Sequence, residues 1–268
     1  MNIVIPMAGA GQRFVDAGYK VHKPAILTTD RLTGRLKPMV VCATQDLPDV
    51  APQGENVIYI DRDFHKNDGV EDVIRQHYPK SRFITIDRLT EGQASTCLLA
   101  KSLINNDEEL LIAGCDNGMV IDIELFEKMK ETCDVLVFTY RHNEAVLAKP
   151  DAYGWVMVDD DQNITGLSIK KAISNQPMND HAIVATFWFK KGSDFVKAAE
   201  KMIQEDDRIN NEFYVDEVVK HSLALGQKCR VFEIDRYIGW GTPRDYEQYM
   251  ETVRYWTEFV RKCKFFNE

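Results

Sequence analysis

Short apolar runs alternate with helix-like patterns through the first half of the chain. The runs are typical of buried strands, and they lie at residues 2–6, 56–60, 82–86, 109–114 and 133–139. Between them, apolar residues recur at helical spacing over residues 38–46, 66–78, 92–104 and 122–131. Strands that alternate with helices predict βαβ units, joined by right-handed crossovers into a mostly parallel sheet.

The second half of the chain has a different pattern. Two strand-like runs flank the polar segment Asp159–Asn163, which predicts a β-hairpin on the surface. The remaining pattern indicates a strand over 183–189, helices over 193–205 and 211–224, and a strand over 229–234.

A long amphipathic helix ends the chain. Thr242 is expected to cap it, Pro243 fits its first turn, and Asp245 suits its N-terminal dipole. Its apolar residues are spaced for one packed face: Tyr246, Tyr249, Met250, Val253, Trp256 and Val260.

These patterns predict an α/β fold with Rossmann-like three-layer αβα architecture. We expect a mixed but mostly parallel central sheet, with the β-hairpin as a small added region. Residues 1–268 are interpreted as a single domain with two halves, about 1–150 and about 151–268, and Pro150-Asp151 is the best internal boundary.

Composition narrows the possible partners. The 268 residues carry 33 basic and 42 acidic side chains, a net charge of −9, so nucleic acid is disfavoured. The six cysteines lack metal-ligand spacing and are expected to be buried free thiols in a reducing cytoplasm. No leader-like or membrane-spanning segment is evident, and the oligomeric state is left open.

The first apolar run leads into Met7-Ala8-Gly9-Ala10-Gly11, followed by Arg13. Glycines after a strand allow backbone N–H groups to approach an anion, and Arg13 adds a planar cation, so this segment is a candidate phosphate cradle. Phe14 excludes the Gly-x-Gly-x-x-Gly fingerprint, and no Walker motif follows. Lys23, beside Pro24, supplies a second cation on a stiff loop. An ordinary glycine turn remains the alternative.

Asp116 is the second candidate. It follows an apolar strand, where a carboxylate can hold Mg2+ together with substrate oxygens. The alternative is a turn or cap residue, since Asn117-Gly118 follows.

Three further segments carry polar groups that suit a ligand. Thr90, Glu91, Gly92 and Gln93 precede a helix and offer donors and acceptors for a base edge, with Thr90 as a helix cap as the alternative. Lys170 and Lys171 end a strand and suit an acceptor phosphate; the alternative is that both are solvated surface residues.

Glu212 and Asp216 are expected one turn apart on a helix. They are candidates to contact the acceptor or to bind a second metal ion, and the alternative is that they cap the helix or interact with its dipole. His181 is expected to be a packed residue.

Together, and in this order, these motifs resemble those of the sugar-1-phosphate nucleotidylyltransferases, or NDP-sugar pyrophosphorylases, of the nucleotidyltransferase superfamily. The resemblance covers nearly the whole chain and includes a C-terminal segment that begins Gly241-Thr242-Pro243. It implies transfer of NMP from an NTP to a small phosphorylated metabolite, with Mg2+ or Mn2+ and release of pyrophosphate. The first half would then bind the nucleotide and the second half the acceptor.

The resemblance also implies roles for individual residues. The glycine turn and Arg13 would hold the β,γ-phosphates, Lys23 would reach the α-phosphate, Asp116 would hold the metal, and Lys170 would bind the acceptor phosphate.

Two departures concern the acceptor side. Ile169 stands where the family usually has Glu, and Gly239 stands where many members have a metal-binding Asp. Asp216, Glu212 and Asp235 are candidates to replace that ligand. A CTP-dependent enzyme acting on a non-sugar phosphate, such as a phosphorylated amino acid or amino alcohol, is therefore the main alternative. A glycosyltransferase and a non-catalytic nucleotide-binding subunit remain further readings.

Overall fold

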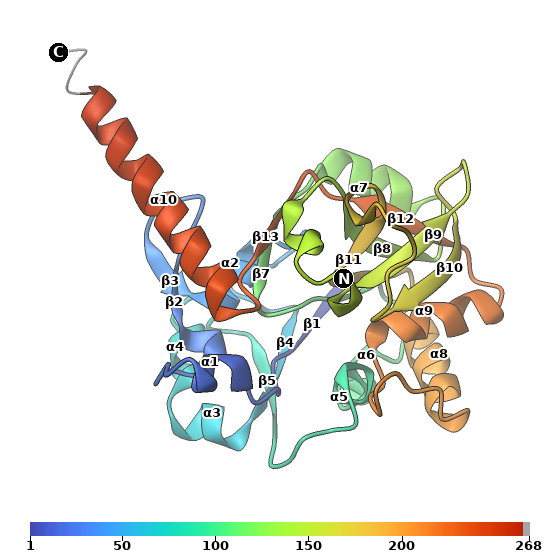
Figure 1. Cartoon of the computed structure of the whole chain (residues 1–268). Helices are drawn as coiled ribbons and strands as arrows, with labels where there is room; N and C mark the ends of the chain where they lie inside the picture. Colours follow the sequence, from blue (N-terminus) through green and yellow to red (C-terminus); the bar gives the residue numbers. More distant parts are fainter. Residues whose placement is uncertain (265–268) are drawn as a thin grey trace.

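A nine-stranded mixed sheet forms the centre of the computed structural model, which describes residues 1–264 (Figure 1). Its strands are β1 (Asn2–Pro6), β4 (Val57–Arg62), β5 (Arg82–Ile86), β6 (Leu110–Ile112), β8 (Val135–Tyr140), β9 (Gly154–Val158), β10 (Ile164–Ile169), β11 (His181–Phe189) and β12 (Cys229–Glu233). β5, β4, β1 and β6 pair in parallel in that order. Within this sheet β10 and β11 run against the other strands, so the expected mostly parallel mixed sheet is confirmed.

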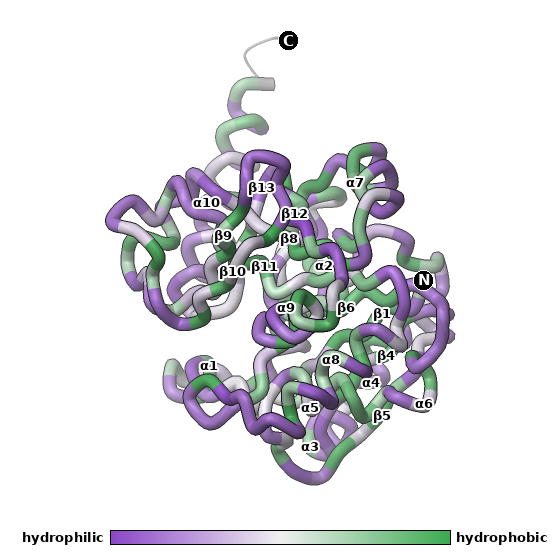
Figure 2. Tube along the Cα trace, turned by 90° about the vertical axis from the view of Figure 1, so that its right-hand side faces the viewer, coloured by the Kyte–Doolittle hydropathy of each residue, from purple (hydrophilic) through white to green (hydrophobic). Residues whose placement is uncertain are grey.

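Helices cover both faces of the sheet, as expected for three layers. One face packs against α5 (Gln93–Leu98), α6 (Lys101–Ile104), α8 (Gly192–Gln204) and α9 (Val215–Ala224). The other packs against α2 (Met39–Gln45), α4 (Val70–Arg75) and α7 (Ile123–Lys130). Because successive side chains of a strand point to opposite faces, Val4 joins the first core and Ile3 and Ile5 the second. The trace in Figure 2, coloured by hydropathy, shows hydrophobic segments concentrated in the strands of the central sheet.

Two expected helices are interrupted. The pattern over 66–78 corresponds to α3 (Asp63–Asn67) and α4, separated by Gly69 at φ 76°. The pattern over 92–104 corresponds to α5 and α6, which meet at Ala100.

Short elements that the pattern did not predict frame the sheet. Two antiparallel ribbons are formed by β2 (Leu27–Thr29) with β3 (Leu36–Pro38) and by β7 (Asn117–Val120) with β13 (Arg236–Gly239). The short helices are α1 (Gln12–Asp16) and the 3-10 turns η1 (Lys23–Ala25), η2 (Glu144–Leu147), η3 (Pro150–Ala152) and η4 (Pro177–Asn179).

The terminal helix α10 (Pro243–Lys264) begins as expected, with the Thr242 hydroxyl accepting from the Asp245 N–H at 3.2 Å. Its first half packs on β2, where the Tyr249 hydroxyl donates to the Thr29 carbonyl at 2.7 Å. Its second half projects from the body (Figure 1), and Trp256 and Val260 are about half exposed. The expectation of one packed face is therefore wrong for this half.

The cysteines are free, and Cys42, Cys97, Cys133 and Cys229 are buried, as expected. Cys115 is half-buried and Cys263 is exposed on α10, so the expectation of burial is wrong for these two. Among the described residues, no helix has the length and apolar character needed to cross a membrane. The single-domain interpretation over 1–268 stays a prediction, and its last four residues lie outside the described part.

Candidate active site

The candidate residues gather where β11 changes partners. The second half of β11 pairs with β6, whereas His181 and Ala182 at its start pair with β9. The register shifts between these two parts, and Ala185 takes a left-handed φ of 60°. β6 and β9 therefore form a fork on one side of β11. Ligands of open α/β sheets bind at such changes in strand order, outside the carboxyl ends of the strands.

The glycine turn follows β1 at this edge of the sheet. Met7 and Ala8 are buried, while Gly9 and Ala10 are exposed, so their backbone is open to a ligand. Gly11 caps α1 in the left-handed region at φ 62°. A Cβ at Gly11 would lie 3.3 Å from Cβ of Lys23, so the turn also packs against the Lys23 loop.

Lys23 and Asp116 form an ion pair across the site. Lys23 begins η1 and is half-buried, and its ammonium lies 5.8 Å from the centre of the Phe14 ring. Burial is the largest single effect and disfavours the charged form, but the charge and hydrogen bond of Asp116, together with Cys115, outweigh it and raise the pKa of Lys23. The lysine is therefore a stable cation beside the glycine turn.

The C-terminal part of the chain completes the surroundings of Asp116. β13 pairs with β7 and ends at Gly239, opposite Asn117. The Trp240 N–H then donates to the Asp116 carbonyl at 2.9 Å, and a Cβ at Gly241 would lie 3.2 Å from Asp116 Oδ2. The Gly241-Thr242 motif thus lies beside Asp116, and Asp116 caps no helix in the described part of the chain.

The oxygens near Asp116 fit a divalent cation shared with a substrate. A Cβ at Gly114 would lie 2.9 Å from Asn117 Oδ1 and 3.3 Å from Asp116 Oδ1, so both oxygens border the same small residue. One carboxylate and one amide oxygen do not enclose Mg2+, which commonly takes its other ligands from phosphates and water. Asp235 lies at the far end of the β7–β13 ribbon, where its N–H donates to Val120, so it does not replace the missing aspartate.

Lys170 approaches from the second half. It follows β10 at a left-handed φ of 58°, and its ammonium bonds to the Ala152 carbonyl. Burial lowers the pKa of Lys170, the charge of Asp216 opposes this, and Arg13 lowers it further. Arg13 also acts to lower the pKa of Lys23. Arg13 is thus close enough to repel both Lys23 from the first half and Lys170 from the second, which is a setting for polyanions.

Asp216 borders this group of cations. A Cβ at Gly154 would lie 2.5 Å from Asp216 Oδ1 and 3.4 Å from the Ile169 side chain. Burial raises the pKa of Asp216 to about 6. Ile169 is 9% exposed and packs in the core. The Asp216 carboxylate on α9 and the Ile169 side chain therefore both border Gly154.

The expected helical pairing of Glu212 with Asp216 is wrong. Asn210 and Asn211 adopt left-handed φ values, and Glu212 forms a bridge with Ile209. α9 begins only at Val215, so Glu212 precedes the helix. Lys171 is exposed, with no ion pair among the described residues.

The Thr90–Gln93 turn is fixed by a close backbone contact. A Cβ at Gly92 would lie 2.5 Å from the Phe213 nitrogen, and the Phe213 N–H donates to the Glu91 carbonyl at 2.8 Å. Gly92, not Thr90, is the N-cap of α5, and the Thr90 hydroxyl instead donates to the Gly92 carbonyl at 3.0 Å. Gln93 is partly exposed at the helix start.

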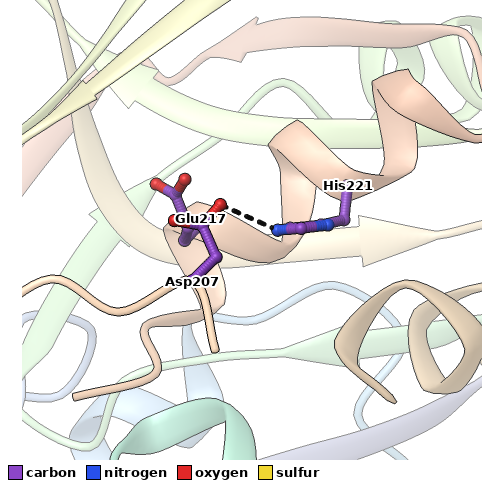
Figure 3. Close-up of side chains that lie close together, drawn as sticks. All are labelled: Asp207, Glu217 and His221. Carbon is purple, nitrogen blue, oxygen red and sulfur yellow. Dashed lines mark hydrogen bonds and ion pairs between the residues drawn. The ribbon is translucent and has the colours of Figure 1, made fainter. Parts of the chain in front are cut away.

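Two groups of polar side chains lie outside the site. His181 is buried and its Nδ1 bonds Thr139 at 2.9 Å, as expected for a packed histidine. Asp207, Glu217 and His221 converge near α9 (Figure 3). The Lys220 ammonium lies 2.7 Å from both carboxylates and already balances their charge, so they are not assigned as a metal centre.

Sequence reasoning missed Gly154, Asn117 and Trp240. The glycine after Tyr153 at the start of a strand, and the two glycines that flank Trp240, are visible in the sequence as unusual backbone positions. Only the fold shows that they lie at the site.

Comparison with solved structures identifies the fold. A nucleoside-diphosphate-sugar pyrophosphorylase from Vibrio cholerae RC9 superposes with a TM-score of 0.73 at 17% identity, over 93% of this chain and 99% of its own. A UDP-glucose pyrophosphorylase complexed with UDP-glucose gives 0.68 at 14%, over 96% and 98%. An inositol-1-phosphate CTP transferase from T. maritima gives 0.62 at 12%, over 94% and 96%. No family model and no curated protein matches the chain in sequence. The chain therefore has the fold of the nucleotidyltransferases, as its motifs indicated.

Proposed function

We propose that this chain transfers NMP from an NTP to a small phosphorylated metabolite and releases pyrophosphate. The observation that carries the proposal is the Lys23–Asp116 ion pair beside the glycine turn, in a fold shared with nucleotidyltransferases. An acceptor phosphate oxygen forms a bond to the α-phosphorus, while the bond from that phosphorus to the α,β-bridging oxygen breaks. Pyrophosphate leaves with the electron pair, and no general base is needed because the acceptor oxygen is already ionised.

The chain's own residues overcome repulsion between two anions and orient them. Backbone N–H groups of Gly9–Gly11 and the Arg13 guanidinium bind the β,γ-phosphates. Lys23 stabilises charge at the α-phosphate, and Lys170 orients the acceptor phosphate. When bound through Asp116, Mg2+ or Mn2+ would neutralise charge on the triphosphate.

A sugar 1-phosphate is the acceptor we favour, because two of the similar structures are named as a nucleoside-diphosphate-sugar pyrophosphorylase and a UDP-glucose pyrophosphorylase. A non-sugar acceptor used with CTP is the alternative. Ile169 supports this alternative, since a packed apolar side chain cannot bond an acceptor hydroxyl. Asp216 is the carboxylate we assign to the acceptor in either case.

The test measures pyrophosphate release with each NTP and divalent cation against a panel of sugar 1-phosphates and other phosphorylated metabolites. Lys23→Ala and Asp116→Asn should each lower kcat by about two decades or more, because each removes a preorganised charge. Lys20→Ala is the matched control, since this exposed lysine makes no ion pair among the described residues. Release that is unaffected by either variant, or NTP binding without release for any acceptor, would contradict the proposal.

A further inference from the structure

The loop that carries Lys23 is also held at His22, by contacts with α3 and the residue after it. His22 immediately precedes Lys23 and is the N-cap of η1. Its Nε2 lies 2.6 Å from Asp68 Oδ2, just after α3. An ionised carboxylate only accepts, so the imidazole N–H donates this bond.

Two rings of α3 complete the contact with His22. Its imidazole centre lies 4.9 Å from that of Phe64 and 5.1 Å from that of His65. His65 is 1% exposed, and its Nδ1 accepts from the Arg62 N–H at 3.3 Å. The ring that His22 meets edge-on is therefore fixed in the protein interior.

The position of Lys23 is thus constrained from two directions. The turn at Gly11 leaves little room beside the Cβ of Lys23, and the Asp68 carboxylate holds the preceding residue, His22. The Ala25 N–H donates to the His22 carbonyl at 2.8 Å and closes the turn around Lys23, so a shift of the His22 backbone also displaces Lys23. A displacement of about 1 Å in a reacting constellation can lower a rate 100-fold.

We infer that His22 and Asp68 are positioning residues that hold the ammonium of Lys23 in the geometry needed for nucleotidyl transfer. The inference rests on the proposed function and adds to it a contact that touches neither substrate. Asp68 is well suited to test it, because its side chain is 63% exposed. Removing an exposed carboxylate ordinarily changes stability by less than about 0.5 kcal/mol.

The experiment compares the steady-state kinetics of the wild type with those of Asp68→Ala and Asp68→Asn. Asp68→Ala should lower kcat about tenfold with little change in the KM of the acceptor, and Asp68→Asn should restore most of the loss because its amide oxygen can still accept from His22. Asp72→Asn is the control, an exposed carboxylate on α4 with no bond to His22. In a Lys23→Ala background, Asp68→Ala should have no further effect, because both act through the same ammonium.

Hydrogen exchange separates failure of this inference from failure of the proposed function. The Ala25 N–H donates to the His22 carbonyl at 2.8 Å, so its exchange should accelerate in Asp68→Ala. If Asp68→Ala exchanges faster but the wild-type protein transfers no nucleotide, then Asp68 does hold the His22 loop and the proposed function is wrong. Unchanged exchange and unchanged kcat, or an equal loss of kcat with and without Lys23, would overturn the inference.

Discussion

Asp61 is a charged residue that the proposed chemistry does not use. It ends a run of buried positions in β4, its exposed fraction is 0%, and neither carboxylate oxygen has a hydrogen bond. The neighbouring Thr85 hydroxyl donates instead to Glu71, at 3.1 Å. Burial, together with the nearby charge of Glu71, raises the pKa of Asp61 to about 6.

Asp61→Asn should therefore stabilise the protein at high pH. An acid with a raised pKa in the folded state binds its proton more tightly there than in the unfolded chain. The free energy of unfolding consequently falls as pH rises from about 4 through 6 and stays lower above. We expect the variant to gain about 2 kcal/mol at pH 8 and little at pH 4, measured by urea unfolding. Asp87→Asn, an exposed carboxylate, is the control, and an equal gain at both pH values would contradict the account.

At this scale the sequence predicted Lys23 and Asp116 but not the placement of Asp216. A lysine beside a proline and a carboxylate after a strand have local signals. Asp216 meets Gly154 only because α9 packs beside the β9–β10 hairpin, a contact across about sixty residues. The left-handed conformation of Lys170 has no sequence signal either, since a lysine seldom adopts it.

The turn before α5 shows how one element depends on another. Gly92 has φ 130° and lies against the Phe213 backbone, with no room for a methyl group. Gly92→Ala should lower the free energy of unfolding by about 3 kcal/mol or more, because backbone atoms rather than a flexible side chain must move. Gly9→Ala is the control for stability, since a Cβ there meets nothing within 4 Å. Thermal unfolding of the two variants measures the difference, and equal melting temperatures would refute the explanation.

The two halves of α10 should contribute unequally to stability. Ending the chain after Arg254 removes residues 255–263, which are exposed, together with the residues beyond them, so the melting temperature should change by less than about 2 °C. Tyr249→Phe loses the hydroxyl bond to Thr29 and should cost about 1 kcal/mol. Calorimetry of both variants tests this, and a large loss on truncation would show that the distal half packs in solution.

Elements with several turns or alternations were predictable, whereas the short ribbons were not. β7 and β13 have four residues each, too few for a periodicity to emerge. The apolar spacing of α10 continues past its contact with β2, because periodicity indicates a face but not whether anything covers it.

In the whole molecule, β11 joins the two halves. It pairs with β6 and β8 from the first half and with β9 from the second. The sequence predicted the strand but not its bend at Ala185, a residue that rarely takes a positive φ. The arrangement of β6 and β9 beside β11, and the electrostatic effect of Arg13 on Lys170 across the two halves, could therefore not be predicted from the sequence.

The shared strand predicts that both halves unfold together. The four tryptophans lie at 155, 188, 240 and 256, so fluorescence reports on the second half, while far-UV circular dichroism reports on both. We expect coincident urea transitions from the two probes. A separate earlier transition in either signal would show that the halves are independent units.

The pairing of β13 with β7 also has a consequence for biosynthesis. Asp116 is translated well before Trp240, whose amide fixes its carbonyl. A nascent chain of which only the first two hundred residues have left the ribosome contains the glycine turn, Lys23 and Lys170. Asp116 in that chain still lacks the hydrogen bond from Trp240. If the proposed function holds, we expect the chain to bind metal and nucleotide together only after the segment around Trp240 has emerged and paired with β7.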